Sequence, residues 1–132
     1  MKVDIRVFHA LDDIAKTNNV SDADWAKASG MNRARLFELR KIYASLDNQD
    51  KYAYKFTISR LISLYRGLYR CIGGSKLNEH LLTFLKNEPD VDVRLTFLIL
   101  LHYDTNLKSK LDMEKYLTDS LTPKLNVVNR KG

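Results

Sequence analysis

The segment SDADWAKASGMNRARLFELRKI, residues 21–42, carries four basic side chains after its glycine: Arg33, Arg35, Arg40 and Lys41. A guanidinium group is a rigid fork of N–H donors, which pairs with phosphate or carboxylate oxygens and with the edge of a guanine base. These residue types therefore favour binding to an anionic ligand.

The net charge of +6 is concentrated in one part of the chain. Residues 31–76 hold ten basic and three acidic side chains, whereas residues 1–30 have a net charge of −1 and residues 77–132 are neutral. A localised basic field is expected of a protein that binds a polyanion. Basic residues that only make exposed helix faces soluble would be spread more evenly along the chain. The clustering therefore favours a polyanion partner.

Residues suited to catalysis are scattered. His9, His80 and His102 are far apart and flanked by apolar residues. Cys71 lies in an aliphatic and aromatic stretch, where it is expected to be a small buried hydrophobe of low reactivity. The chain has no Gly-rich phosphate loop and no Cys-x-x-Cys pair. We expect no catalytic residue, no cofactor and no metal ligand, and a protein that is not an enzyme.

The composition predicts a helical protein. Of 132 residues, 45% are hydrophobic and 29% charged, and five glycines and two prolines leave little material for a turn-rich β fold. The single cysteine indicates a reducing compartment. The N-terminus has no signal-peptide pattern, and the longest apolar stretch, LTFLILL at 95–101, is far shorter than the roughly 20 residues of a membrane span. We expect a cytoplasmic protein that does not contact a membrane.

Apolar residues at helical spacing predict helices over 4–17, 22–29, 33–45, 54–72, 76–88, 91–103 and 111–121. Val3, Ile5 and Val7 also alternate, which leaves a short strand open at the start. Residues 91–103 alternate too, but a lone strand needs a partner, so a helix is favoured. From Thr122, around Pro123, the chain is expected to be frayed.

The second and third of these helices are separated by a short turn with clear local signals. Ser21 and Asn32 are good N-caps, and Ser75 is a candidate cap for the helix after Gly73 and Gly74. Gly30 can take the positive φ that ends a helix, and Asn18 and Asn19 are expected to stop the first helix.

Small and apolar residues stand where two steeply crossing helices would touch. Ala26 leaves room for a close approach between the helices. The inward positions are predicted to be Trp25, Met31, Leu36 and Leu39. The first turn of the second helix of the pair then points outward, without a role in the core.

At this segment the chain resembles the helix-turn-helix family of phage repressors and Cro-like regulators, the lambda-repressor-like class. The matching elements are Ala26, Gly30 four residues later, then Met31, Leu36 and Leu39. The resemblance covers about residues 4–74. The chain departs from the family at Trp25, where leucine or isoleucine is usual, and in ELRKIYASL, which lacks the Glu-x-Gly that often closes the second helix of the motif.

The resemblance implies an all-α, lambda-repressor-like bundle. The residues after 75 match no known family, and their own pattern predicts a C-terminal helical extension. The resemblance also implies double-stranded DNA as the partner, with the second helix of the motif in the major groove, and a transcriptional regulator of repressor type that acts as a homodimer on a palindromic operator. The DNA-binding positions mapped by the motif are Asn32, Arg33, Ala34, Arg35, Phe37, Glu38 and Lys41.

The chemistry of these side chains suits such a groove. Arg33 is suited to guanine O6 and N7, Ala34 or Phe37 to a thymine methyl group, and Glu38 to a cytosine amine or to orienting a neighbouring arginine. Phosphates are the expected ligands of Asn32, Arg35 and Lys41. For the arginines the alternative is a hydrated helix face, and for Phe37 a partly buried core position. Arg66 and Arg70 are either a second phosphate stripe or a hydrated rim.

Two parts of the chain are expected: residues 1–75 as the DNA-binding domain and residues 76–132 as the extension. The extension is rich in leucine and aromatic residues, so it either packs back on the first part or forms a dimer or partner interface. One alternative function is a protein-interaction or antitoxin-like adaptor on the same scaffold. Another is RNA binding through Tyr52, Tyr54, Tyr65 and Tyr69.

Overall fold

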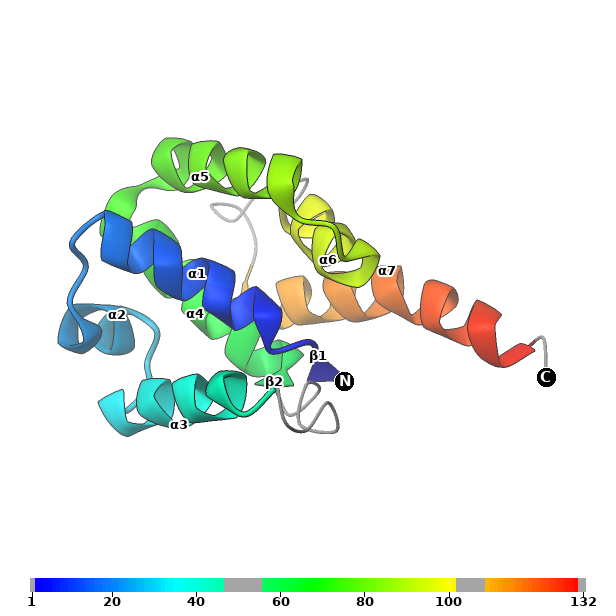
Figure 1. Ribbon diagram of the computed structural model, residues 1–132, viewed down its shortest axis with the longest axis horizontal. Helices are drawn as coiled ribbons and strands as arrows, with labels where there is room; N and C mark the ends of the chain where they lie inside the picture. The colour runs from blue at the N-terminus through cyan, green and yellow to red at the C-terminus, as the bar shows by residue number, and fades with distance from the viewer. Residues whose placement is uncertain (1, 47–55, 102–108, 131–132) are drawn as a thin grey trace.

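The computed structural model describes residues 2–46, 56–101 and 109–130, with side chains described as far as Leu121. The fold is all-α, as predicted, and none of the described helices is both long and apolar enough to span a membrane. The elements follow one another in the order β1 (Lys2–Val3), α1 (Arg6–Thr17), α2 (Asp22–Ala28), α3 (Arg33–Ala44), β2 (Phe56–Thr57), α4 (Ile58–Ile72), α5 (Gly74–Asn87), α6 (Val91–Leu101) and α7 (Lys110–Arg130) (Figure 1).

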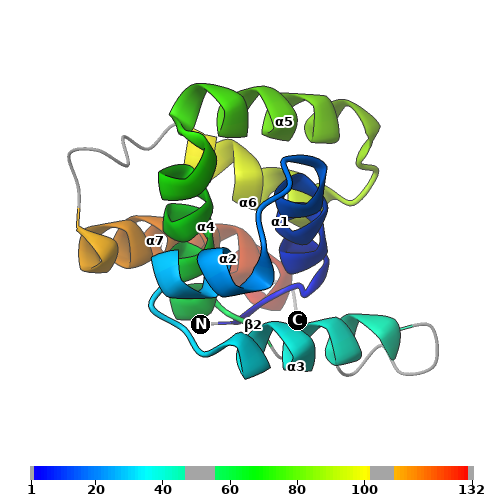
Figure 2. The same ribbon diagram turned by 90° about the vertical axis from the view of Figure 1, so that its left-hand side faces the viewer.

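Helix α4 lies at the centre of the fold. It contacts α1, α2, α5 and α7, which Figures 1 and 2 show arranged around it. Because neighbours cover several of its sides, α4 is buried at Leu61, Ile62, Leu64, Tyr65 and Leu68. The amphipathic pattern therefore predicted this helix correctly, but its buried surface is wider than one stripe.

Caps and turns end the first helices where the sequence predicted them. The Ser21 hydroxyl accepts a hydrogen bond from Asp24 N at 3.1 Å, and Asn32 Oδ1 accepts one from Ala34 N at 3.0 Å. Asn19 at φ 58° ends α1, and Gly30 at φ 68° ends α2. After both residues the next N–H bonds back to a carbonyl five residues earlier, which is the Schellman pattern.

The start of α4 and the start of α5 differ from prediction. Helix α4 begins at Ile58 rather than near residue 54, because Phe56 and Thr57 pair with β1; Lys2 lies opposite Thr57 in this antiparallel pair. The Thr57 hydroxyl then caps α4. Ser75 is not an N-cap: α5 begins at Gly74, directly after Gly73, which turns the chain at φ 85°.

The C-terminal part of the chain is more helical than predicted. Residues 91–101 form α6, as favoured, and residues 102 and 103 lie outside the described residues. Helix α7 continues through Pro123 to Arg130, so the expectation of a frayed tail from Thr122 is wrong. A proline removes one backbone hydrogen bond, but the remaining bonds of a long helix can carry the helical backbone past it.

The C-terminal helices pack back on the N-terminal ones. Leu77 and Leu81 of α5, Phe97 of α6 and Leu117 of α7 belong to the same hydrophobic core as Phe8 of α1. Full burial of one such side chain stabilises the fold by roughly 1.5–3 kcal/mol. The apolar surface predicted for the extension is thus partly used inside the molecule.

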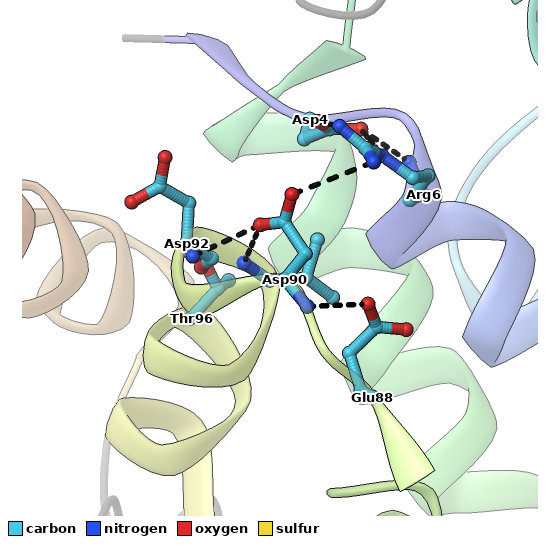
Figure 3. Close-up of polar contacts among 7 residues, drawn as sticks. Asp4, Arg6, Glu88, Asp90, Asp92 and Thr96 are labelled. Carbon is cyan, nitrogen blue, oxygen red and sulfur yellow. Dashed lines mark hydrogen bonds and ion pairs between the residues drawn. The ribbon is translucent and has the colours of Figure 1, made fainter.

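A polar network also joins the chain start to α6 (Figure 3). The Arg6 guanidinium lies 2.6 Å from Asp4 Oδ2 and 3.4 Å from Asp90 Oδ2. Asp90 Oδ1 accepts hydrogen bonds from the backbone N of Asp92 and of Val93, and so caps α6. Arg6, the first residue of α1, therefore links Asp4 to Asp90, the residue before α6.

Gly67 is required where α2 meets α4. A Cβ at Gly67 would lie 2.0 Å from Ser29 Oγ and 2.8 Å from Ser29 N. We expect Gly67→Ala to lower the free energy of unfolding by about 1–3 kcal/mol in urea titrations, because α2 must move away from α4. Ser29→Ala alone should be nearly neutral, because the Ser29 hydroxyl is buried without a hydrogen-bond partner in the described part of the chain. The double variant should recover part of the loss, and an unchanged stability in Gly67→Ala would contradict the close approach.

Candidate nucleic-acid interface

Helix α3 lies along one edge of the molecule, at the bottom of Figures 1 and 2. Its inner side chains, Leu36 and Leu39, are fully buried, as predicted. All the predicted DNA-binding residues are exposed: Asn32, Arg33, Ala34, Arg35, Phe37, Glu38 and Lys41. The structure thus gathers these residues on and just before a single helix with an open outer surface.

The turn before α3 frees the first residues of that helix. Ser29 to Asn32 connect α2 to α3, with Gly30 in the left-handed conformation. The first turn of α3 has no acidic residue and contains Arg33 and Arg35. The N-terminus of a helix already carries partial positive charge. The start of α3 is therefore the kind of surface that attracts anions.

Arg40 fixes α3 to the rest of the molecule. Its Nε and Nη2 donate hydrogen bonds to the Asp12 carboxylate of α1 at 3.0 and 2.8 Å. Its Nη1 and Nη2 donate to the Asp22 carboxylate of α2 at 2.8 and 2.6 Å. Lys16 Nζ lies 3.2 Å from Asp12 as well. One guanidinium group therefore binds three helices together, and we call these four residues the Arg40 clamp.

The charges of the clamp stabilise one another. The hydrogen bond from Arg40 holds the pKa of Asp22 below its ordinary value. The hydrogen bonds to Asp22 and Asp12 raise the pKa of Arg40, which is charged at any working pH. The sequence pattern did not predict this role of Arg40, because Asp12 and Asp22 are 28 and 18 residues away along the chain. The sequence did contain a signal for an inward role of Arg40. Arg40 lies four residues after Leu36 and directly after Leu39, the two residues of α3 that are buried.

Glu38 contacts Arg35 on the outer face of α3. The Glu38 carboxylate accepts a hydrogen bond from Arg35 Nη1 at 3.1 Å, and both side chains are at least half exposed. Exposed pairs of this kind stabilise by about 0–1 kcal/mol, so either side chain is free to turn toward a ligand. This contact agrees with the orienting role predicted for Glu38 as one of its two options.

Trp25 anchors α2 on α4. Its side chain is fully buried, and its Nε1 donates a hydrogen bond to the Leu64 carbonyl at 3.0 Å. Its ring is parallel to the Phe8 ring at 6.0 Å between centroids. The inward position predicted for Trp25 is confirmed. Leucine or isoleucine at this position could not donate the hydrogen bond that the indole N–H makes to the Leu64 carbonyl.

Arg66 and Arg70 have contacts within the protein. Arg70 Nη1 donates to the Ala28 carbonyl at 2.8 Å, at the C-terminal end of α2, where a positive charge is favourable. Arg66 Nη1 lies 3.3 Å from the Met113 sulfur of α7. Both arginines therefore join elements of the fold, a role that neither predicted alternative described.

Tyr65, one of the four tyrosines predicted for RNA binding, is 1% exposed and cannot stack on a base. Tyr69 is partly buried, and its ring would be 2.8 Å from a Cβ at Gly74. Tyr52 and Tyr54 lie outside the described residues. One of the four tyrosines predicted to bind RNA, Tyr65, is therefore excluded from that role.

The two described histidines have different partners. His9 stacks on Tyr43 at 3.9 Å and lies 3.3 Å from Asp13, while His80 contacts Asn18. His102 is outside the described residues. A pocket of about 450 Å³ is lined by Cys71 and Asp24 among others, but by neither His9 nor His80.

Cys71 is exposed, so the expectation of a buried cysteine is wrong. It lies near the C-terminal end of α4, three residues after the buried Leu68. Partial burial, and then the nearby Asp24 carboxylate, raise the pKa of the Cys71 thiol. A raised pKa lowers the thiolate fraction at neutral pH, which agrees with the low reactivity expected from the sequence.

The outer face of α3 and the Arg40 clamp beneath it define the candidate interface. Compared with models of protein families, with curated proteins and with solved structures, the chain has no significant match. The assignment of a function therefore depends on the side chains of this surface.

Replacing Arg40 tests the clamp. Arg40→Met keeps much of the side-chain volume but leaves Asp12, 3% exposed, without its guanidinium partner. We expect a loss of about 3 kcal/mol in the free energy of unfolding, at the low end for a broken buried pair because Lys16 still lies beside Asp12. Arg35→Met, which removes only an exposed pair, should change stability by less than about 0.5 kcal/mol. Equal small effects of both variants would contradict the clamp.

The clamp should also make stability depend on acid pH. Because the folded pKa of Asp22 is below its ordinary value of 3.8, the unfolded chain takes up the proton more readily. The contribution of Asp22 to stability is therefore present above pH 3.8 and is lost as pH falls through the lowered folded pKa. We expect urea titrations of Asp22→Asn to show a smaller loss between neutral and acid pH than wild type. Asp119→Asn removes the same charge from an exposed position on α7 and should keep the wild-type dependence of stability on pH. A wild-type dependence on pH in Asp22→Asn would contradict this role of Asp22.

Proposed function

We propose that the protein binds double-stranded DNA sequence-specifically, with α3 in the major groove. The observation that carries this proposal is the division of α3 into two faces. Leu36, Leu39 and Arg40 hold the inner face, and the outer face presents basic and polar groups to solvent. The major groove accommodates one α-helix, and side chains on its outer face reach the base edges.

Each exposed residue has a role in this proposal. Arg33 pairs with guanine O6 and N7, and Glu38 accepts from a cytosine amine or orients Arg35. Asn32, Arg35 and Lys41 bind phosphates, which set the position of the helix in the groove. The start of α3 supports this arrangement, because two arginines there add to the partial charge of the helix end.

As a working proposal, the protein is a transcriptional regulator of repressor type that binds a palindromic operator as a homodimer. Two copies of α3 would then occupy half-sites about 34 Å apart. Exposed apolar residues on the C-terminal helices are candidates for the contact between copies: Leu82, Val91, Leu98, Leu111 and Tyr116.

The same exposed apolar residues favour a second candidate function, a protein-interaction or antitoxin-like adaptor. In that case a different protein would cover the C-terminal helices, and the basic residues of α3 would serve only solubility. RNA binding has less support, because Tyr65 is buried.

Binding to DNA tests the proposal directly. Random-sequence duplexes selected by the wild-type protein at several salt concentrations should yield an enriched palindromic site, and the logarithm of affinity should fall linearly with the logarithm of salt concentration. Arg33→Ala should lose about 1–3 kcal/mol of binding free energy and accept other bases at one position of each half-site. Arg35→Ala should weaken all sequences alike and reduce the salt slope by about 0.9.

The matched control is Lys115→Ala, which removes one exposed positive charge from α7. It should leave both the enriched site and the salt slope unchanged. No binding at low salt would end the DNA proposal and favour the adaptor. Equal losses in Lys115→Ala and Arg33→Ala would show attraction to net charge without a defined interface.

A further inference from the structure

Phe37 is the exception among the large apolar residues of α3. Leu36 and Leu39 are fully buried, whereas Phe37 is 47% exposed on the outer face. At spacings of three and four residues, its neighbours on that face are Arg33, Ala34 and Lys41. An aromatic ring and a small methyl-bearing residue thus form an apolar spot between two cations.

The Phe37 ring is supported from within the protein. The Arg40 guanidinium carbon lies over the ring, 5.8 Å from its centroid. Arg40 is itself fixed by its hydrogen bonds to Asp12 and Asp22. A cation over an aromatic ring attracts it, so the clamp limits the orientations of Phe37. A ring that is already ordered loses less conformational entropy when it binds a ligand.

A DNA major groove offers few apolar groups to such a ring. Among the four base pairs, only those with thymine present a methyl group in the groove, at C5. Phe37 is one helical turn from Arg33, about 6 Å along the axis, which corresponds to fewer than two base-pair steps of about 3.4 Å. A thymine methyl group near a guanine bound by Arg33 is within reach of the ring.

We infer that Phe37 is a specificity-determining residue that packs against a thymine methyl group within two base pairs of the guanine read by Arg33. The inference rests on the proposed DNA binding and names what that surface reads. A purely structural role for Phe37, covering the Arg40 clamp, predicts a different result. It requires a loss of stability in Phe37→Ala and no dependence of binding on the thymine methyl group.

Deoxyuridine provides the test, because it differs from thymidine in duplex DNA only by the missing C5 methyl group. Each thymine of the enriched site is replaced by deoxyuridine in turn, and affinity is measured for wild type and Phe37→Ala. At one thymine of each half-site, wild type should bind the deoxyuridine duplex about four-fold more weakly, the effect of one buried methyl-sized group. Phe37→Ala should bind both duplexes equally at that position, with an overall affinity below that of wild type.

Two control variants separate the outcomes. Lys115→Ala, an exposed change on α7 outside the proposed interface, should retain the four-fold preference for thymine. Ala34→Gly should retain it as well, because the ring and not Ala34 makes the contact. Thermal unfolding of each variant in the absence of DNA reports any loss of stability.

The results distinguish the two levels of the hypothesis. Failure to enrich any duplex overturns the proposed function and this inference together. An enriched site with no sensitivity to deoxyuridine in wild type overturns only the role of Phe37. If the preference for thymine is kept in Phe37→Ala but lost in Ala34→Gly, Ala34 makes the contact, and the inferred role of Phe37 is wrong.

Discussion

The hydrogen-bonded ion pairs of Arg40 with Asp12 and Asp22 determine where α3 lies. Asp12 is almost completely buried, and a buried carboxylate is costly without a partner. Arg40 satisfies it and at the same time binds Asp22 at the start of α2. Buried pairs of this kind contribute little net stability compared with apolar packing, but they tolerate few alternative arrangements. We regard the clamp chiefly as a device that fixes one orientation of α3.

The position of α2 depends on apolar and backbone contacts. Trp25 fills the space between α2 and α4, and its N–H bonds to the Leu64 carbonyl. Gly67 allows the end of α2 to come close to α4, and Arg70 donates a hydrogen bond to the Ala28 carbonyl at that end. With α2 held in this way, the short turn through Gly30 leaves α3 little freedom, and the clamp removes much of the rest.

This arrangement gives residues of the same helix, α3, different roles. Arg33 and Arg40 have the same side chain, yet Arg33 is exposed and Arg40 has four hydrogen bonds inside the protein. Substitutions on the outer face can therefore change what the helix binds without loosening its attachment. Phe37 lies at the boundary, because its ring contacts the guanidinium of the clamp and is also open to solvent.

The sequence by itself determined the local features: the helices, the caps at Ser21 and Asn32, the positive φ at Gly30 and the outer face of α3. These depend on a few neighbouring residues, whose backbone preferences and hydrogen bonds act within one or two turns. Only the tertiary structure decided which charged and polar groups meet. The partners of Arg40 are 28 and 18 residues away, and that of Arg70 is 42 residues away. Such pairs depend on how the helices pack, and a pattern along one helix does not contain that information.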